Sequence, residues 1–200
     1  MSKYVAFLRG INVGGSKVIK MEVLRALFES LGFTNVTTYI QTGNVIFDAR
    51  GRNLTTLQSK VQEELKNSLG HEISVALMNF SDLTAIVKRD PFAGVEVNED
   101  VMLFVTFLSA QPAAIPKLPL AVLKENFEVI GLQDRAVFIV ARRKSDGRAA
   151  FPNAFIEKQF GVPGTTRNWS VVKKISSELK QLTDKISPAK AQRRKALPRI

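Results

Sequence analysis

Two runs that are apolar at nearly every position constrain the fold of this chain most: YVAFL at Tyr4–Leu8 and VMLFVTFL at Val101–Leu108. Neither approaches the roughly 20 residues of a membrane-spanning helix. A strand without polar alternation is covered on both faces of its sheet. The run after Lys3 is also too short for the core of a secretory signal. We therefore expect a soluble, cytoplasmic protein with two covered sheet strands and no membrane contact.

The first half predicts the order of a split βαβ unit, which is typical of ferredoxin-like domains. Its expected elements, alternating as strand, helix, strand, strand, helix, strand, are Tyr4–Leu8, Met21–Leu31, Val36–Gln41, Val45–Phe47, Leu54–Leu65 and Ile73–Met78. The turn TGN between the middle strands is a hairpin signal. A short helix at Ser81–Lys88 follows, with Ser81 as its N-cap.

The second half repeats this order in part. Its expected elements are a strand at Val101–Leu108, a helical stretch at Leu118–Lys124, strands at Phe127–Leu132 and Ala136–Ala141, a helix at Pro152–Phe160 and a long helix from about Thr166. We therefore expect an α+β fold of two related split βαβ units with antiparallel or mixed sheets and a long C-terminal helix. The expected domains are an N-terminal unit at 1–89, a polar linker at 90–100, a second unit at 101–183 and a tail at 184–200.

Composition excludes several classes of chemistry. The chain has no cysteine and a single histidine, His71. These counts exclude disulfide scaffolds, zinc–thiolate sites, thiol catalysis and histidine-cluster metal sites. No general base is identifiable, and the sequence indicates no metal, cofactor, catalytic residue or oligomeric state.

The chain is basic, with 29 Lys and Arg against 18 Asp and Glu and a formal net charge of +11. Of this, +5 falls within residues 184–200, which also hold Pro188 and Pro198. Such a segment buries too little apolar surface to offset its ordering entropy, so we expect a disordered tail. Its simpler role is to keep the protein soluble. Binding of nucleic acid by the basic body and tail is the alternative function, and it would be salt-sensitive.

Three loop segments carry the polar residues that favour a ligand site. The first, Arg9–Lys20, reads RGINVGGSKVIK between a strand and a helix. Gly10, Gly14 and Gly15 permit positive φ, so successive backbone N–H groups can surround an anion. The segment matches neither GxGxxG nor the P-loop pattern. An anion-binding loop and a glycine-rich turn with solvated lysines are equally good interpretations.

The second segment, Tyr39–Asn44, reads YIQTGN and predicts a hairpin turn in which Gly43 adopts a positive φ. In a split βαβ unit the first two strands run in the same direction, so both segments leave the sheet at one edge. Carboxamides and a guanidinium would then converge beside the glycine loop. The residues expected to meet there are Arg9, Asn12, Gln41 and Asn44.

The third segment, Gly161–Trp169, reads GVPGTTRNW. Thr165 or Thr166 is expected to cap the long C-terminal helix, with Trp169 in the core. A helix N-terminus with free N–H groups and an arginine can bind an anion, which favours Arg167 and Asn168 as ligand residues.

The motifs FLRGINVGG (Phe7–Gly15), YIQTGNVIF (Tyr39–Phe47) and TTRNW (Thr165–Trp169), in this order, resemble those of the bacterial family called domain of unknown function 1697. The resemblance covers nearly the whole chain outside the tail. It implies a compact protein of two related α+β units and supplies no established activity. Ser170–Val171 stands where the family often has a polar pair. The family pattern selects Arg9, Asn12, Gln41, Asn44, Arg167 and Asn168.

We therefore expect the chain to bind a small anionic ligand, such as a nucleotide or phosphorylated metabolite, in a cleft formed by these three segments. The expected ligand residues are Arg9, Gly10, Asn12, Gly14, Gly15, Gln41, Asn44, Arg167 and Asn168. Two arginines brought together without acidic partners would repel each other, and a ligand anion would supply the missing charge. Otherwise the arginines are exposed, or they pair with distant acids such as Asp48 or Glu157. On the ligand interpretation Arg167 is exposed, and replacing it changes stability by less than about 1 kcal/mol.

Overall fold

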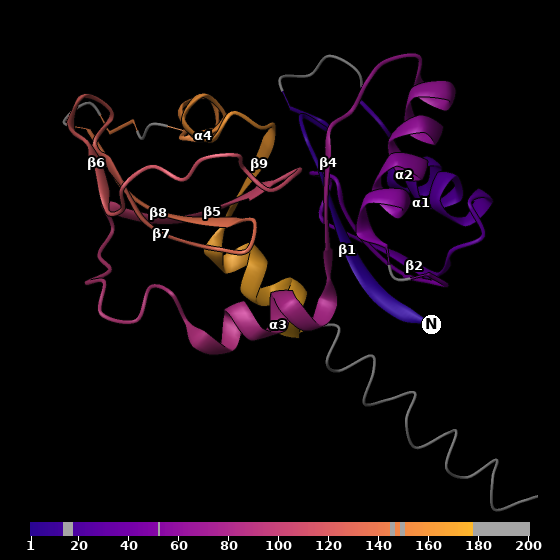
Figure 1. Ribbon diagram of the computed structural model, residues 1–200, viewed down its shortest axis with the longest axis horizontal. Coiled ribbons are helices and arrows are strands. Elements are labelled where there is room, and N and C mark those ends of the chain that lie inside the picture. Colours follow the sequence, from indigo (N-terminus) through magenta and orange to yellow (C-terminus); the bar gives the residue numbers. More distant parts are fainter. Residues whose placement is uncertain (14–17, 52, 145–146, 149–150, 178–200) are drawn as a thin grey trace, which may run out of the picture.

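The computed structural model describes residues 1–13, 18–51, 53–144, 147–148 and 151–177. Gly14, Gly15, the tail at 184–200 and the part of the expected C-terminal helix beyond residue 177 lie outside the described residues. Within the described part the protein is a mixed α+β fold with two antiparallel sheets, which stand side by side (Figure 1).

In the first half the elements lie close to their predicted positions. They are β1 (Ser2–Leu8), α1 (Met21–Ser30), β2 (Thr34–Tyr39), β3 (Asn44–Ala49), α2 (Leu54–Leu69), β4 (Val75–Asn79) and α3 (Phe80–Arg89). The second half forms β5 (Val101–Leu108), β6 (Leu120–Val122), the 3-10 turn η1 (Leu123–Glu125), β7 (Phe127–Gln133), β8 (Ala136–Arg142), α4 (Asn153–Phe160), β9 (Gly164–Asn168) and a helix at residues 169–177.

The two sheets share one strand order and one register. The first sheet runs β2-β3-β1-β4 and the second runs β6-β7-β8-β5-β9. In this order β7, β8, β5 and β9 correspond to β2, β3, β1 and β4, and β6 is an additional edge strand. Phe7 of β1 faces Asn44 and Ala76 on its two neighbours. Phe107 of β5 faces Ala136 and Thr165 at the corresponding places. A helix directly follows the fourth strand in both halves: α3 after β4, and residues 169–177 after β9.

Each sheet buries both faces. Tyr4, Ala6 and Leu8 of β1 point into a cluster under α1 and α2, while Val5 and Phe7 point the other way into a central cluster. The second sheet has the same alternation, with α4 over its outer face. This agrees with the prediction, drawn from the unbroken apolar runs, that both leading strands are covered on two faces.

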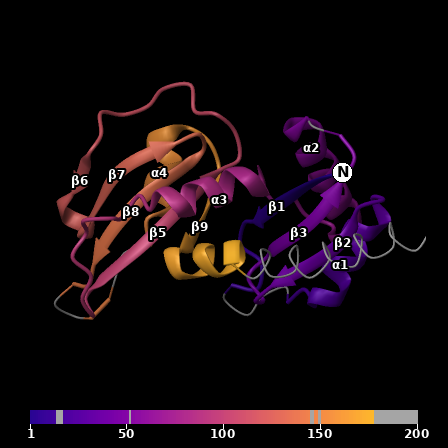
Figure 2. The same ribbon diagram turned by 90° about the horizontal axis from the view of Figure 1, so that it is seen from below.

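The central cluster joins the two halves. Phe7 and Phe107 stack across it with ring centroids 3.9 Å apart and an interplanar angle of 3°. Helix α3 and the helix at 169–177 contribute to the same cluster from below the two sheets, as Figures 1 and 2 show. Trp169 is 3% exposed and lies in this cluster, in agreement with its predicted place in the core.

Three local predictions are wrong. Leu118–Lys124 is not helical: Leu120–Val122 pairs with β7, and a 3-10 turn follows it. Ser81 is not an N-cap, because α3 already begins at Phe80 after Asn79. Thr165 and Thr166 do not cap a helix but belong to β9, which pairs with β5. Their β-branched side chains favour a strand, and β5 lies beside this segment and pairs with it.

Gly43 holds the β2–β3 turn against β1. Its φ is +75°, and a Cβ added there would lie 2.9 Å from Leu8 Cβ and 3.0 Å from Ile11 Cβ. The turn is further tied to β1 by the Leu8 N–H, which donates to the Gly43 carbonyl at 2.8 Å. The residue is therefore glycine for two reasons, its backbone conformation and its close packing.

We expect Gly43→Ala to lower the free energy of unfolding by about 2–5 kcal/mol, since left-handed φ costs about 1–2 kcal/mol and overpacking about 1–3 kcal/mol. Gly10→Ala is the matched control, because Gly10 has a φ of +68° but no atom within 4 Å of an added Cβ. Urea denaturation of both variants measures the difference. Equal losses would mean that the turn does not pack against Leu8 and Ile11 as described.

Candidate functional site

Asn12 fastens the loop after β1 to the β2–β3 turn. Its φ is +57°, a conformation that asparagine tolerates better than most residues. Its Nδ2 donates to the Ile19 carbonyl at 3.0 Å and to the Gln41 carbonyl at 2.9 Å, while its Oδ1 accepts from the Ile19 N–H at 2.7 Å. The two segments that the sequence placed at one sheet edge are therefore joined directly.

Arg167 joins β9 to the same edge. The side chain leaves β9 one residue before the end of the strand and crosses to β1 and the β2–β3 turn, with its guanidinium carbon 5.9 Å from the centre of the Phe7 ring. A guanidinium has five N–H groups, and all five find acceptors. These are Asn44 Oδ1 (2.6 Å), Thr165 Oγ1 (2.7 Å), Thr166 O (2.9 Å), Leu8 O (2.9 Å) and Thr42 O (2.8 Å).

The charge of Arg167 has no acidic partner among the described residues. Burial lowers the pKa of its guanidinium to about 10, so that the group still carries its proton at neutral pH. Carbonyl and hydroxyl dipoles stabilise it instead of a carboxylate. This corrects the expectation of an exposed arginine at a helix start: Arg167 is a part-buried strand residue that holds three segments together.

Arg9 differs from Arg167 in its surroundings. Its Nη2 donates to Glu157 of α4 at 2.7 Å, and its side chain is 49% exposed. Glu157 is thus the distant acidic partner that the sequence offered as the alternative for this arginine. Asp48, the other acid considered, accepts from Asn35. The remaining N–H groups of Arg9 have no partner among the described residues, so they can bind a ligand.

A pocket of about 720 Å³ lies where these segments meet, and we call it the β9 pocket. Its polar lining includes Arg9, Asn153, Arg167 and Asn168, and its apolar lining includes Val13, Ile40, Phe104 and Phe151. Three of these apolar side chains are exposed: Val13 (67%), Ile40 (45%) and Phe151 (63%). Exposed apolar residues from three separate segments thus surround one pocket, whose charged lining is Arg9, Arg167 and Glu72.

The predicted site residues divide into lining and supporting groups. Arg9, Gly10, Arg167 and Asn168 line the β9 pocket. Asn12 and Asn44 do not line the pocket. Asn44 is fully buried and accepts from Arg167, and Asn12 makes hydrogen bonds within the loop after β1. Gln41 is exposed and contributes its carbonyl to Asn12.

Sequence reasoning missed the residues that the second half contributes. Asn153 accepts from the Thr166 hydroxyl at 3.1 Å, and Phe104 and Phe151 meet edge to face with centroids 6.0 Å apart. Glu157 stands 148 residues from its partner Arg9. Each belongs to an ordinary helix, strand or loop pattern, and only the packing of the two halves brings them to the loop after β1.

The described residues hold no group of three or more histidine or acidic side chains placed to bind a metal ion. No helix in the described part of the chain is long and apolar enough to cross a membrane.

Comparisons with known proteins place the chain by family and fold. Residues 1–138, more than two thirds of the chain, match the family described as "Protein of unknown function (DUF1697)". The fold is similar to that of the conserved bacterial protein SP0830 from Streptococcus pneumoniae, with a TM-score of 0.66 at 19% sequence identity over 88% of this chain and 97% of that one. No curated protein matches the sequence.

We expect Arg167→Lys to lower the free energy of unfolding by about 2–4 kcal/mol. An ammonium has three N–H groups against five, so part-buried acceptors lose their donors, at about 1–3 kcal/mol for each buried group left unpaired. The control, Arg9→Lys, keeps the exposed ion pair with Glu157 and should change stability by less than about 1 kcal/mol. Chemical denaturation measures both, and a neutral Arg167→Lys would show that the five contacts do not hold the segments together.

Proposed function

Because the chain belongs to the DUF1697 family, whose function is unknown, we propose a function from its own geometry: the protein binds a small anionic ligand in the β9 pocket. The observation that carries the proposal is the pair of arginines that line this pocket. Arg9 offers unpaired N–H groups, and Arg167 adds a positive charge that pairs with no carboxylate among the described residues. A ligand anion would be attracted by both.

The ligand we propose has an apolar part beside its anionic group. The exposed apolar side chains Val13, Ile40 and Phe151 face the same pocket as the arginines. Ligand pockets of roughly 300–1,000 Å³ combine apolar walls with a few polar anchors in this way. Nucleotides and phosphorylated metabolites with an apolar body have both features.

We also infer that the two halves are copies of one split βαβ, ferredoxin-like unit, and that the second copy diverged to form the pocket. The shared strand order and register support this. At equal positions β4 reads VALMN and β9 reads GTTRN, so that Met78 corresponds to Arg167. The copy that carries the polar strand is the one that lines the β9 pocket.

The test is calorimetric titration with inorganic phosphate, AMP and UMP, comparing the unmodified protein with Arg9→Gln. Losing a charged hydrogen bond of about 1.5–3 kcal/mol should weaken binding by about 10- to 100-fold. Stability should change by less than about 1 kcal/mol, since the ion pair of Arg9 is exposed. The matched control is Lys173→Gln, which removes an exposed charge that does not line the pocket.

The proposal fails if none of the three anions binds, or if Arg9→Gln and Lys173→Gln behave alike. Binding of an oligonucleotide that weakens steeply with salt and is unchanged in Arg9→Gln would instead favour nucleic-acid binding, the function that the net charge of +11 suggests.

A further inference from the structure

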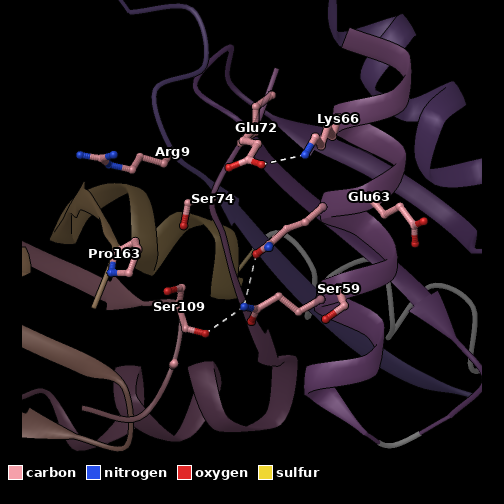
Figure 3. Close-up of a pocket in the computed structure, with 12 residues that line it drawn as sticks. Arg9, Ser59, Glu63, Lys66, Glu72, Ser74, Ser109 and Pro163 are labelled. Atoms are coloured by element: carbon pink, nitrogen blue, oxygen red, sulfur yellow. Dashed lines mark hydrogen bonds and ion pairs between the residues drawn. The ribbon is translucent and has the colours of Figure 1, made fainter. Parts of the chain in front are cut away.

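A second pocket, of about 680 Å³, adjoins the β9 pocket and lies against α2; we call it the α2 pocket. Arg9, Glu72 and Ser74 line both pockets. Figure 3 shows Arg9 at one side of the α2 pocket and α2 at the other, with Ser74 and Ser109 between them. Arg9 therefore stands at the junction of two adjoining spaces.

The α2 pocket presents neutral hydrogen-bonding groups. The hydroxyls of Ser59, Ser74 and Ser109 and the Nε2 of Gln62 have no partner among the described residues. Gln58 is already used, because its Nε2 donates to the Ser109 carbonyl at 2.9 Å. The free groups comprise three hydroxyls, which both donate and accept, and one amide donor. Such a set matches a ligand part that carries several hydroxyl groups.

The acidic residue shared by the two pockets, Glu72, is paired with a lysine. Glu72 accepts from Lys66 at 2.8 Å, and Figure 3 shows its carboxylate between Arg9 and Lys66. The ammonium of Lys66 lowers the pKa of Glu72, so the carboxylate is ionised and paired at neutral pH. The unpaired N–H groups of Arg9 are the polar anchor at the junction.

We propose that the two pockets bind one elongated ligand: an aromatic group beside Phe151, a phosphate or diphosphate beside Arg9, and a hydroxyl-rich group in the α2 pocket. The proposal rests on the proposed function and extends it from the β9 pocket to both. Sugar nucleotides and dinucleotides share this chemistry, since each joins a base to a second hydroxylated group through a diphosphate. Inorganic phosphate or a nucleoside monophosphate would use only part of the available contacts.

The experiment compares UDP-glucose with UMP, and ADP-ribose and NAD⁺ with AMP, by calorimetric titration of the full chain. The longer member of at least one pair should bind at least tenfold more tightly than its monophosphate. A Ser59→Ala/Ser109→Ala double variant, which alters residues of the α2 pocket alone, should remove this gain and leave monophosphate binding unchanged. The matched control is Ser30→Ala/Ser68→Ala, which removes two exposed hydroxyls outside both pockets and should preserve the gain.

A separate variant tests the contact between Phe151 and the aromatic group of the ligand. Phe151→Ala should weaken AMP and UMP binding at least fivefold and leave inorganic phosphate binding unchanged, because phosphate has no base to contact the ring. Sugar nucleotides and dinucleotides are distinguished by which pair shows the gain.

The outcomes separate the two proposals. If monophosphates bind but no longer ligand binds more tightly, or the gain survives the Ser59/Ser109 variant, the elongated ligand is wrong and the β9 pocket proposal stands. An unchanged affinity for AMP and UMP in Phe151→Ala overturns the aromatic assignment. If no phosphate compound binds, both proposals fail together.

Discussion

The guanidinium of Arg167 holds together the edge on which the candidate site is built. Its five donated hydrogen bonds reach β1, β9 and the β2–β3 turn, at distances between 2.6 and 2.9 Å. Without it, Asn44 Oδ1 and the carbonyls of Leu8, Thr42 and Thr166 would each lose a donor in a part-buried place. Planar geometry and fixed donor directions suit arginine, and not lysine, to this role. The positive charge that remains is then a fixed feature of the β9 pocket.

The polar residues of β9 stand where the equivalent strand of the first half has apolar residues. In the first sheet, β4 contributes Ala76 and Met78 to the central cluster. At the same register positions β9 carries Thr165 and Arg167. Polar groups in such places must be paired within the protein, and here they are: the Thr166 hydroxyl bonds to Thr106 and Asn153, and Thr165 to Arg167. A fully paired polar strand gives the halves different chemistry on the same framework.

Much of the fold was predictable because it depends on local patterns. The apolar runs of β1 and β5, the helical spacing in α1 and α2, and the glycine of the β2–β3 turn each indicated an element that the structure contains. The errors lie where local signals compete. The segment TTRN is compatible with a helix N-cap, but its threonines also favour a strand. It forms a strand because the edge of β5 is available to pair with it. No pairing partner is visible in the sequence of TTRN itself.

The candidate site was predictable to a lesser degree. Strand direction was enough to bring Asn12 next to Gln41, because both lie on loops at one edge of one sheet. It was not enough to place Arg167 against Asn44, which depends on how the two sheets pack around the Phe7–Phe107 stack. The roles of the arginines also differ from the expectation of two similar ligand residues. Side-chain packing saturates Arg167 and leaves Arg9 only partly used.

The ion pair between Arg9 and Glu157 is compatible with a ligand at this place. An exposed pair contributes at most about 1 kcal/mol, whereas a charged hydrogen bond to a ligand in a desolvated pocket contributes about 1.5–3 kcal/mol. Glu157 also accepts from the Gly164 N–H at 2.8 Å, so it is held in place from a second side and does not depend on Arg9. Arg9 uses one of its nitrogens for Glu157 and keeps the others. The pair thus orients the guanidinium at the junction of the two pockets without exhausting it.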